Sequence, residues 1–238
     1  MLKIEIDADN TQLTWTDANN VKSSKSVDLA EIVAALSSNV SQDYGLLPQG
    51  CRHLTQKGNF TRLALEVPSQ VLTLAYNDQS VNTVSIPPAL FLFTVAKKPE
   101  GFNVIYSKVF AMRNESVILS TDALFTYPLP NIYEDNRICW GNNASATKGL
   151  KSLAALGGLV RRFFSAPFNQ DLFNTRCLNV EFPWGELDKK TEYLALNYFK
   201  YLSKNTFNKS WLKPIQDDNY NTVTKAIKSF QNGVEDER

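Results

Sequence analysis

The chain has 238 residues, of which 43% are hydrophobic and 21% charged, as is ordinary for a globular protein with a sizeable core. Its formal net charge is +1, so no overall field favours binding to nucleic acid. No cationic start followed by an apolar run and no apolar stretch of membrane-spanning length is visible, so we expect no membrane contact. The three cysteines, Cys51, Cys139 and Cys177, have no paired spacing, which favours a reducing, cytoplasmic compartment.

Histidine is scarce, and this limits the chemistry available to the chain. The one histidine is His53, and Cys51-Arg-His53 alone is a poor template for zinc, so we expect no metal site. Cys–His and Ser–His–Asp catalysis are excluded unless His53 itself reaches the site. Gly157-Gly158 is not followed by Lys and Ser or Thr, so it does not match a phosphate-binding loop.

The N-terminal part predicts a strand pair and a helix. Residues 2–6 and 11–16 alternate apolar and polar side chains, which is typical of a β-hairpin. Asp28 followed by Glu31 resembles a capping box and predicts a helix over 28–37, where the apolar side chains share one face.

Four strand candidates follow, each rich in aromatic and β-branched residues. They are Arg62–Val67, Gln70–Tyr76, Ala89–Ala96 and Phe102–Met112. Because they are short and closely spaced, we expect one antiparallel meander and an α+β fold. The helices at 28–37 and 147–164 are expected to pack against it.

Apolar residues at helical spacing predict three helices in the second half of the chain. These are 147–164, Glu186–Ser203 and a short helix over Thr222–Phe230. Gly157-Gly158 falls inside the first and weakens it by about 1 kcal/mol per glycine relative to alanine, so we expect a kink or a site of close packing there.

The predicted domain organisation has three parts. Residues 1–44 form the hairpin and helix, packed on the core. Residues 45–210 form the core itself, and residues 211–238 form a C-terminal helical tail.

The run from Pro128 to Gly141 combines a proline-framed turn, an acidic loop tip and a cysteine. Each proline fixes its own φ and favours an extended conformation for the residue before it. Asn136, at the turn, is well suited to positive φ. Cys139 lies between two apolar residues, eight positions after Asn131.

This run resembles the active-site segment of ubiquitin-conjugating enzymes. In that family a His-Pro-Asn triplet precedes the catalytic cysteine, which lies in a Gly-x-Ile-Cys-Leu-like run. Pro130-Asn131 match the last two residues of the triplet, and Ile138-Cys139 match the end of the motif. The interval of eight residues is the family's usual spacing.

Two positions depart from the pattern, since Leu129 replaces the histidine and Asn136 replaces the glycine. The wider context, over roughly residues 45 to 175, is similar to a divergent prokaryotic branch of the PRTRC system protein B type. The segments that carry this likeness are Leu47-Pro-Gln-Gly, Pro68-Ser-Gln and Phe163-Phe-Ser-Ala-Pro-Phe.

The resemblance implies a ubiquitin-conjugating-enzyme-like fold: an antiparallel β-meander with flanking helices, here with an N-terminal hairpin-helix and extra C-terminal helices. It implies Cys139 as the nucleophile that carries a thioester and Asn131 as the residue that stabilises the oxyanion or orders the loop. By proximity in sequence only, Asp171, Glu134 and Asp135 are candidates for the acid that helps to deprotonate an acceptor lysine.

The same resemblance implies the partners. They are a ubiquitin-like modifier protein, a ThiF-like adenylating enzyme that loads the cysteine, and a JAB-type isopeptidase as a further partner. No small cofactor is expected on this chain, because the adenylating partner would consume the ATP.

Two alternatives remain open from the sequence. The first is a non-catalytic module of the same fold that binds the ubiquitin-like protein or serves in assembly, which the replacement of histidine by Leu129 favours. The second is an α+β structural protein in which Cys139 is buried core, because Ile-Cys-Trp is also an ordinary core sequence.

Overall fold

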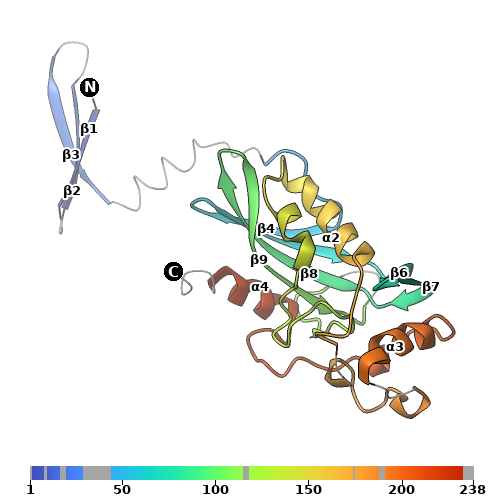
Figure 1. The fold of residues 1–238 in the computed structure, drawn as a ribbon. Coiled ribbons are helices and arrows are strands. Elements are labelled where there is room, and N and C mark those ends of the chain that lie inside the picture. Colours follow the sequence, from blue (N-terminus) through green and yellow to red (C-terminus); the bar gives the residue numbers. More distant parts are fainter. Residues whose placement is uncertain are drawn as a thin grey trace. The chain divides into compact units, whose positions relative to one another are not determined.

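The computed structural model describes residues 2–7, 10–16, 20–28, 44–114, 118–173, 175–187 and 191–232. The chain divides into two compact units, Met1–Tyr44 and Gly45–Arg238, shown in Figure 1. Each unit is described by itself.

The first unit contains a three-stranded antiparallel sheet in the order β1-β2-β3. Its strands are β1 (Leu2–Asp7), β2 (Asn10–Thr16) and β3 (Lys22–Val27). β1 pairs with β2 where the sequence predicts a hairpin. β3 is not predicted, because its sequence is mostly polar. The helix expected over 28–37 lies, from residue 29 onward, outside the described residues.

The second unit is built on a five-stranded sheet in the order β10-β9-β8-β5-β4. The strands are β4 (Cys51–Lys57), β5 (Phe60–Val67), β8 (Ala89–Lys98), β9 (Gly101–Ala111) and β10 (Phe125–Thr126). Every neighbouring pair is antiparallel. The mixed α and β structure with antiparallel sheets is therefore confirmed.

The expectation that all four predicted strands share one meander is wrong for the second of them. β6 (Gln70–Tyr76) pairs with β7 (Gln79–Ile86) in a separate two-stranded ribbon, and β5 pairs directly with β8. Prolines follow both β5 and β7, and a proline cannot donate to a strand ladder, so the ribbon turns out of the sheet.

The central strand β8 explains why both faces of the sheet are covered. All residues from Ala89 to Ala96 are buried. Phe91 packs on Phe163 and Phe164 of α2 (Leu156–Ser165), each at 5.8 Å between ring centroids. Its neighbours Leu90 and Leu92 belong to a core cluster with residues of α4 (Val223–Asn232). Successive side chains on a strand point to opposite faces, so α2 and α4 cover opposite sides of the sheet (Figure 1).

The helix expected over 147–164 is wrong in its first half. Two short 3₁₀ helices, Gly141–Thr147 and Leu153–Ala155, precede α2. Gly149 between them has φ 63°, a left-handed conformation that ends helical geometry. Gly157 and Gly158 therefore lie in the first turn of α2, where they cause neither an interior kink nor close packing. An added Cβ would meet nothing nearer than 4.0 Å at either position.

The helix expected over Glu186–Ser203 is shorter in the structure. α3 spans Leu194–Leu202, and the chain before it forms the 3₁₀ helices Trp184–Glu186 and Thr191–Tyr193. Further 3₁₀ turns lie at Thr175–Cys177 and Lys209–Trp211. In the described parts of the chain, no helix is both long enough and apolar enough to cross a membrane.

Candidate active site

The segment from Asn131 to Cys139 is a small hairpin. Ile132 bridges Ile138 in antiparallel fashion, and the backbone N–H of Tyr133 donates to the Arg137 carbonyl at 2.9 Å. At the base of the hairpin the backbone N–H of Cys139 donates to the Asn131 carbonyl at 2.8 Å. The interval of eight residues thus brings the two predicted site residues face to face.

Two asparagines make this hairpin possible. Asn131 has φ 61° and Asn136 has φ 67°. Asparagine enters the left-handed region at lower cost than other residues with a Cβ. The expectation that Asn136 adopts positive φ is confirmed, and it explains how Asn136 replaces a glycine at this turn.

The returning arm of the hairpin is fixed to β9. The N–H of Ile138 donates to the Ser107 carbonyl at 3.1 Å, and the N–H of Val109 donates to the Asn136 carbonyl at 3.0 Å. The indole N–H of Trp140 donates to the Ser107 hydroxyl at 3.0 Å. Cys139 therefore follows a segment that is hydrogen-bonded along the main sheet.

The entering arm is held by an apolar anchor. Leu129 is only 3% exposed, and its backbone N–H donates to the Tyr127 carbonyl at 3.0 Å. Tyr127 is buried too and donates its hydroxyl to the Pro87 carbonyl at 3.3 Å, and this burial raises its pKa well above the usual range. Burial of Leu129 thus stabilises the loop without the hydrogen bonds of a histidine.

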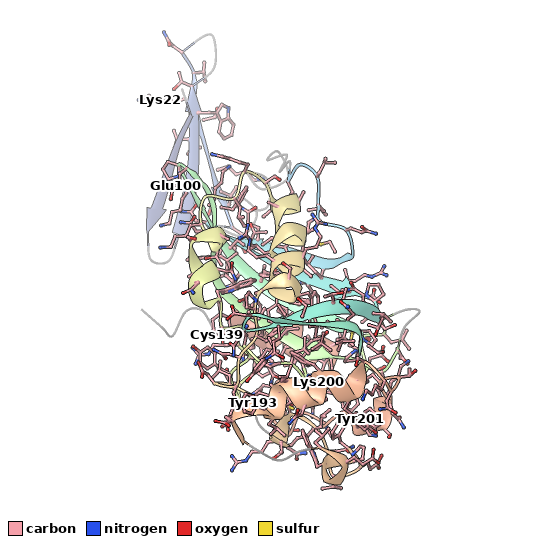
Figure 2. All side chains as sticks on the ribbon, turned by 45° about the vertical axis from the view of Figure 1, so that its right-hand side comes forward. Lys22, Glu100, Cys139, Tyr193, Lys200 and Tyr201 are labelled. Atoms are coloured by element: carbon pink, nitrogen blue, oxygen red, sulfur yellow. The ribbon has the colours of Figure 1, made fainter. Side chains whose placement is uncertain are left out.

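Cys139 lines an open groove with a volume of about 430 Å³. Asn131, Tyr133, Trp140 and Asp171 are among the other residues that line it. Cys139 is half-buried, and it lies on a loop segment outside the helices, as Figure 2 shows. The cysteine is therefore accessible from this groove.

The sequence also matches a known family. The family model for prokaryotic E2 family D matches residues 52–215. The chain belongs to this family. No curated protein sequence and no solved structure matches it. In this E2-like chain the matched range contains the main sheet, the hairpin and the groove, whereas β1, β2, β3 and α4 lie outside it.

Tyr133 is a groove residue of the E2-like chain that the sequence reasoning missed. Its hydroxyl lies 3.5 Å from the Cys139 sulfur, within reach of a hydrogen bond. This hydrogen bond is the largest reason why the pKa of Tyr133 is raised. The Arg137 guanidinium lies 5.3 Å from the Tyr133 ring and steadies it. Its position two residues after Asn131, on the arm that faces Cys139, is the signal that could have identified it.

The side chain of Asn131 orders the site. Its amide nitrogen donates to the Pro167 carbonyl at 3.4 Å, just beyond the end of α2. The hairpin is thereby tied to the segment that forms the opposite wall of the groove, which contains Pro167 and Asp171.

Of the three candidate acids, only Asp171 lines the groove. Its backbone N–H and one carboxylate oxygen are hydrogen-bonded to the side chain of Asn169, at 3.1 and 2.8 Å. Glu134 lies 3.5 Å from Arg176, and Asp135 accepts from Arg137 at 2.6 Å. Both of these acids line other hollows of the surface.

The other two cysteines have different surroundings. Burial raises the pKa of the Cys51 thiol and raises that of Cys177 to about 12. His53 lies on β4, where burial lowers its pKa, and it does not line the groove. Within the described residues, no group of three or more His, Cys, Asp or Glu side chains could hold a metal ion.

Proposed function

We propose that this chain is a conjugating enzyme that carries a ubiquitin-like protein as a thioester on Cys139 and passes it to an amine. One observation carries the proposal: in a member of prokaryotic E2 family D, Cys139 and Asn131 face each other at the base of one hairpin and line one groove. Cysteine suits the role because its thiolate is both a good nucleophile and a good leaving group.

Loading is a transfer of an acyl group. The Cys139 sulfur attacks the activated C-terminal carbonyl of the modifier, the bond to the activating group breaks, and the thiol proton leaves to solvent. Tyr133 is placed to donate a hydrogen bond to the sulfur while that sulfur carries negative charge.

In discharge the Cys139 sulfur is the leaving group, whereas in loading it is the nucleophile. The acceptor amine attacks the thioester carbonyl, an amide bond forms, and the Cys139 thiolate leaves. Asn131 has a second amide N–H besides the one directed at Pro167, and this one can stabilise the oxyanion. Asp171, on the opposite wall, is the carboxylate that we assign to accept the proton of the amine.

The proposed partners are a ubiquitin-like modifier, a ThiF-like adenylating enzyme and a JAB-type isopeptidase, as in a system of the PRTRC type. The adenylating partner would consume ATP.

A second function is favoured by Leu129. Its buried aliphatic side chain stands where the conjugating-enzyme motif has histidine, so a non-catalytic module that binds the ubiquitin-like protein without forming a thioester is the alternative.

Reconstitution with the proposed partners and ATP separates the two functions. The enzyme should form an adduct that thiol reductants cleave, and Cys139→Ser should form no adduct or an ester that resists the reductant. Cys51→Ser is the matched control and should load normally. Binding of the modifier without any adduct, in the presence of an active adenylating enzyme, supports the non-catalytic alternative.

A further inference from the structure

Charge is unevenly distributed along the second unit. The formal net charge of the whole chain is +1, yet no Asp or Glu occurs between Asp135 and Asp171. That interval contains Lys148, Lys151 and Arg162, all of which are exposed. The even overall balance therefore conceals a part of the chain that is locally basic.

The fold fixes this basic segment to the turn between β8 and β9. The backbone N–H of Phe102 donates to the Leu150 carbonyl at 2.8 Å, and the N–H of Leu150 donates to the Phe102 carbonyl at 2.9 Å. The N–H of Gly149 donates to the side-chain oxygen of Asn103 at 2.7 Å. The loop that precedes α2 is thus held by three hydrogen bonds against a hairpin that lies far from it in sequence.

Gly101 permits the close approach of the two segments. It has φ 138°, and an added Cβ would lie 2.5 Å from the Leu150 carbonyl oxygen. Leu150 bridges one edge of β9 at Phe102, and Lys97 of β8 pairs with the same residue from the other edge. Neighbouring strands lie about 4.8 Å apart, so the backbones of the two basic segments are about 10 Å apart.

Four lysines project from this junction, which we call the basic end. They are Lys97 and Lys98 at the end of β8 and Lys148 and Lys151 in the loop. All four are exposed, and within the described ranges none of them has an ion pair. The one acid in these two segments is Glu100, in the β8–β9 turn and labelled in Figure 2. Four cations therefore face a single anion.

The basic end is continuous with the rim of the cysteine groove. The 3₁₀ helix of seven residues, Gly141–Thr147, begins at a residue that lines the groove and ends directly before Lys148. At about 2.0 Å per residue this helix is about 14 Å long. The guanidinium of Arg162 donates to the side-chain oxygen of Asn143, another residue of the groove, at 3.5 Å. Positive charge thus extends from the hairpin turn to the groove.

The residue types of the basic end favour carboxylates over nucleic acid. Sites for single-stranded nucleic acid combine positive charge with aromatic side chains on which the bases stack. None of the exposed aromatic side chains in the described parts of the chain lies in either segment. Lysine ammonium groups are compact charges on flexible stems, and they can pair with carboxylates in many arrangements.

We propose that the basic end docks an acidic face of a protein partner and holds that partner at the rim of the Cys139 groove. Complementary charge would steer the encounter and increase the rate of association, and salt would weaken it. The proposal rests on the placement of charge and does not depend on thioester chemistry at Cys139, so either one can fail without the other.

The test is a titration of the full chain followed by fluorescence anisotropy. The probe is a blocked peptide of four Glu-Asp-Gly repeats with a neutral fluorophore, and its uncharged twin has four Gln-Asn-Gly repeats. Oligothymidylate with eight phosphates has the same charge as the acidic peptide, and vesicles of phosphatidylcholine with phosphatidylserine offer an anionic lipid surface. We expect the chain to bind the acidic peptide more tightly than any of these and to release it as salt rises from about 0.01 to 0.1 M, where the screening length falls from about 30 to 10 Å.

Two sets of substitutions locate the binding surface. Neutralising the basic end with Lys97→Gln, Lys98→Gln, Lys148→Gln and Lys151→Gln together should weaken binding of the acidic peptide at least tenfold. The matched control removes the same charge from exposed lysines in and after α3 and on α4, with Lys200→Gln, Lys204→Gln, Lys225→Gln and Lys228→Gln. It should weaken binding less than twofold. Both proteins should keep the parent melting temperature, because substitutions of exposed residues rarely change stability.

Four results would overturn the proposal. Equal weakening by the two sets of substitutions would reduce the effect to a general attraction of lysines. Tighter binding of oligothymidylate than of the peptide, lost when the basic end is neutralised, would assign the surface to nucleic acid. The same result with vesicles would assign it to a membrane surface. Failure to bind the acidic peptide even at low salt would leave the basic end as a solvated surface.

Discussion

Cys139 differs from the other two cysteines in what surrounds its sulfur. It lines an open groove beside the Tyr133 hydroxyl, whereas burial raises the pKa of both Cys51 and Cys177. Thiols react as thiolates, so the raised pKa values of Cys51 and Cys177 slow the reaction of these two thiols. In native protein, a thiol reagent should label Cys139 first and Cys177 last. Peptide mass mapping over time measures the order, with urea-unfolded protein as the control in which all three react alike. Slow labelling of Cys139 would contradict an accessible nucleophile.

Asn131 combines a backbone role with a side-chain role, and two substitutions separate them. Asn131→Ala loses the bond to Pro167 and places a Cβ residue without a polar side chain at φ 61°, which costs about 1–2 kcal/mol of stability. Asn131→Gly loses the same amide but accepts the positive φ. If the amide stabilises the oxyanion, both variants should load normally and transfer roughly a hundred- to a thousandfold more slowly. Single-turnover discharge to lysine measures this. If Asn131→Gly transfers at the normal rate, the side-chain amide of Asn131 orders the loop and does not stabilise the oxyanion.

Much of this residue-scale chemistry can be predicted from the chain. The interval of eight residues and the turn preference of Asn136 are local facts, and both correspond to the observed hairpin. The partners of Asn131 and Trp140 cannot be predicted in this way, because Pro167 and Ser107 are distant in sequence and only tertiary packing brings them near.

At the scale of elements, the hairpin from Asn131 to Cys139 depends on burial of its entering arm. Leu129 is 3% exposed, so truncation to alanine should leave a cavity and cost about 2–5 kcal/mol of unfolding free energy. Leu46→Ala, at a residue that is 81% exposed, is the matched control and should cost much less. Urea unfolding measures both. A small loss for Leu129→Ala would mean that the hydrogen bonds to β9 hold the hairpin alone.

The strands divide into those that the sequence could predict and those that it could not. β8 contains a long, nearly continuous apolar run because the sheet buries both of its faces there, and β5 and β9 are rich in apolar and aromatic residues. β3 and β7 are mostly polar, and β4 lies at the sheet edge with exposed positions, so their side chains resemble those of loops. β5 pairs with β8 although the β6–β7 ribbon lies between them in sequence. Local sequence patterns do not determine such a long-range pairing.

At the scale of the whole molecule, α4 completes the core although it lies outside the matched family range. Phe230 is 3% exposed and its ring lies 5.5 Å from that of Tyr106 on β9. Phe230→Ala should therefore lower the free energy of unfolding by about 3–5 kcal/mol. Tyr193→Ala, at an aromatic residue that is 46% exposed, is the control. Thermal unfolding followed by circular dichroism measures the difference. Equal effects of the two variants would show that α4 is not part of the cooperative unit.

The aliphatic anchor at Leu129 has a consequence for acid tolerance. Histidine is the one side chain whose ordinary pKa lies within about pH 5 to 8, and the only histidine is on β4, outside the groove. The hairpin therefore has no imidazole to charge as a solution becomes mildly acidic. As the pH falls from about 7.5 to 5, the amide resonances of Asn131 and Cys139 should hold their positions. Those around His53 should move as its ring gains a proton, with a midpoint below the ordinary value because burial lowers its pKa. A shift in the hairpin that follows the His53 titration would disprove this. A loop anchored by leucine has no group there that changes protonation state in this range, whereas a loop anchored by histidine would have two protonation states.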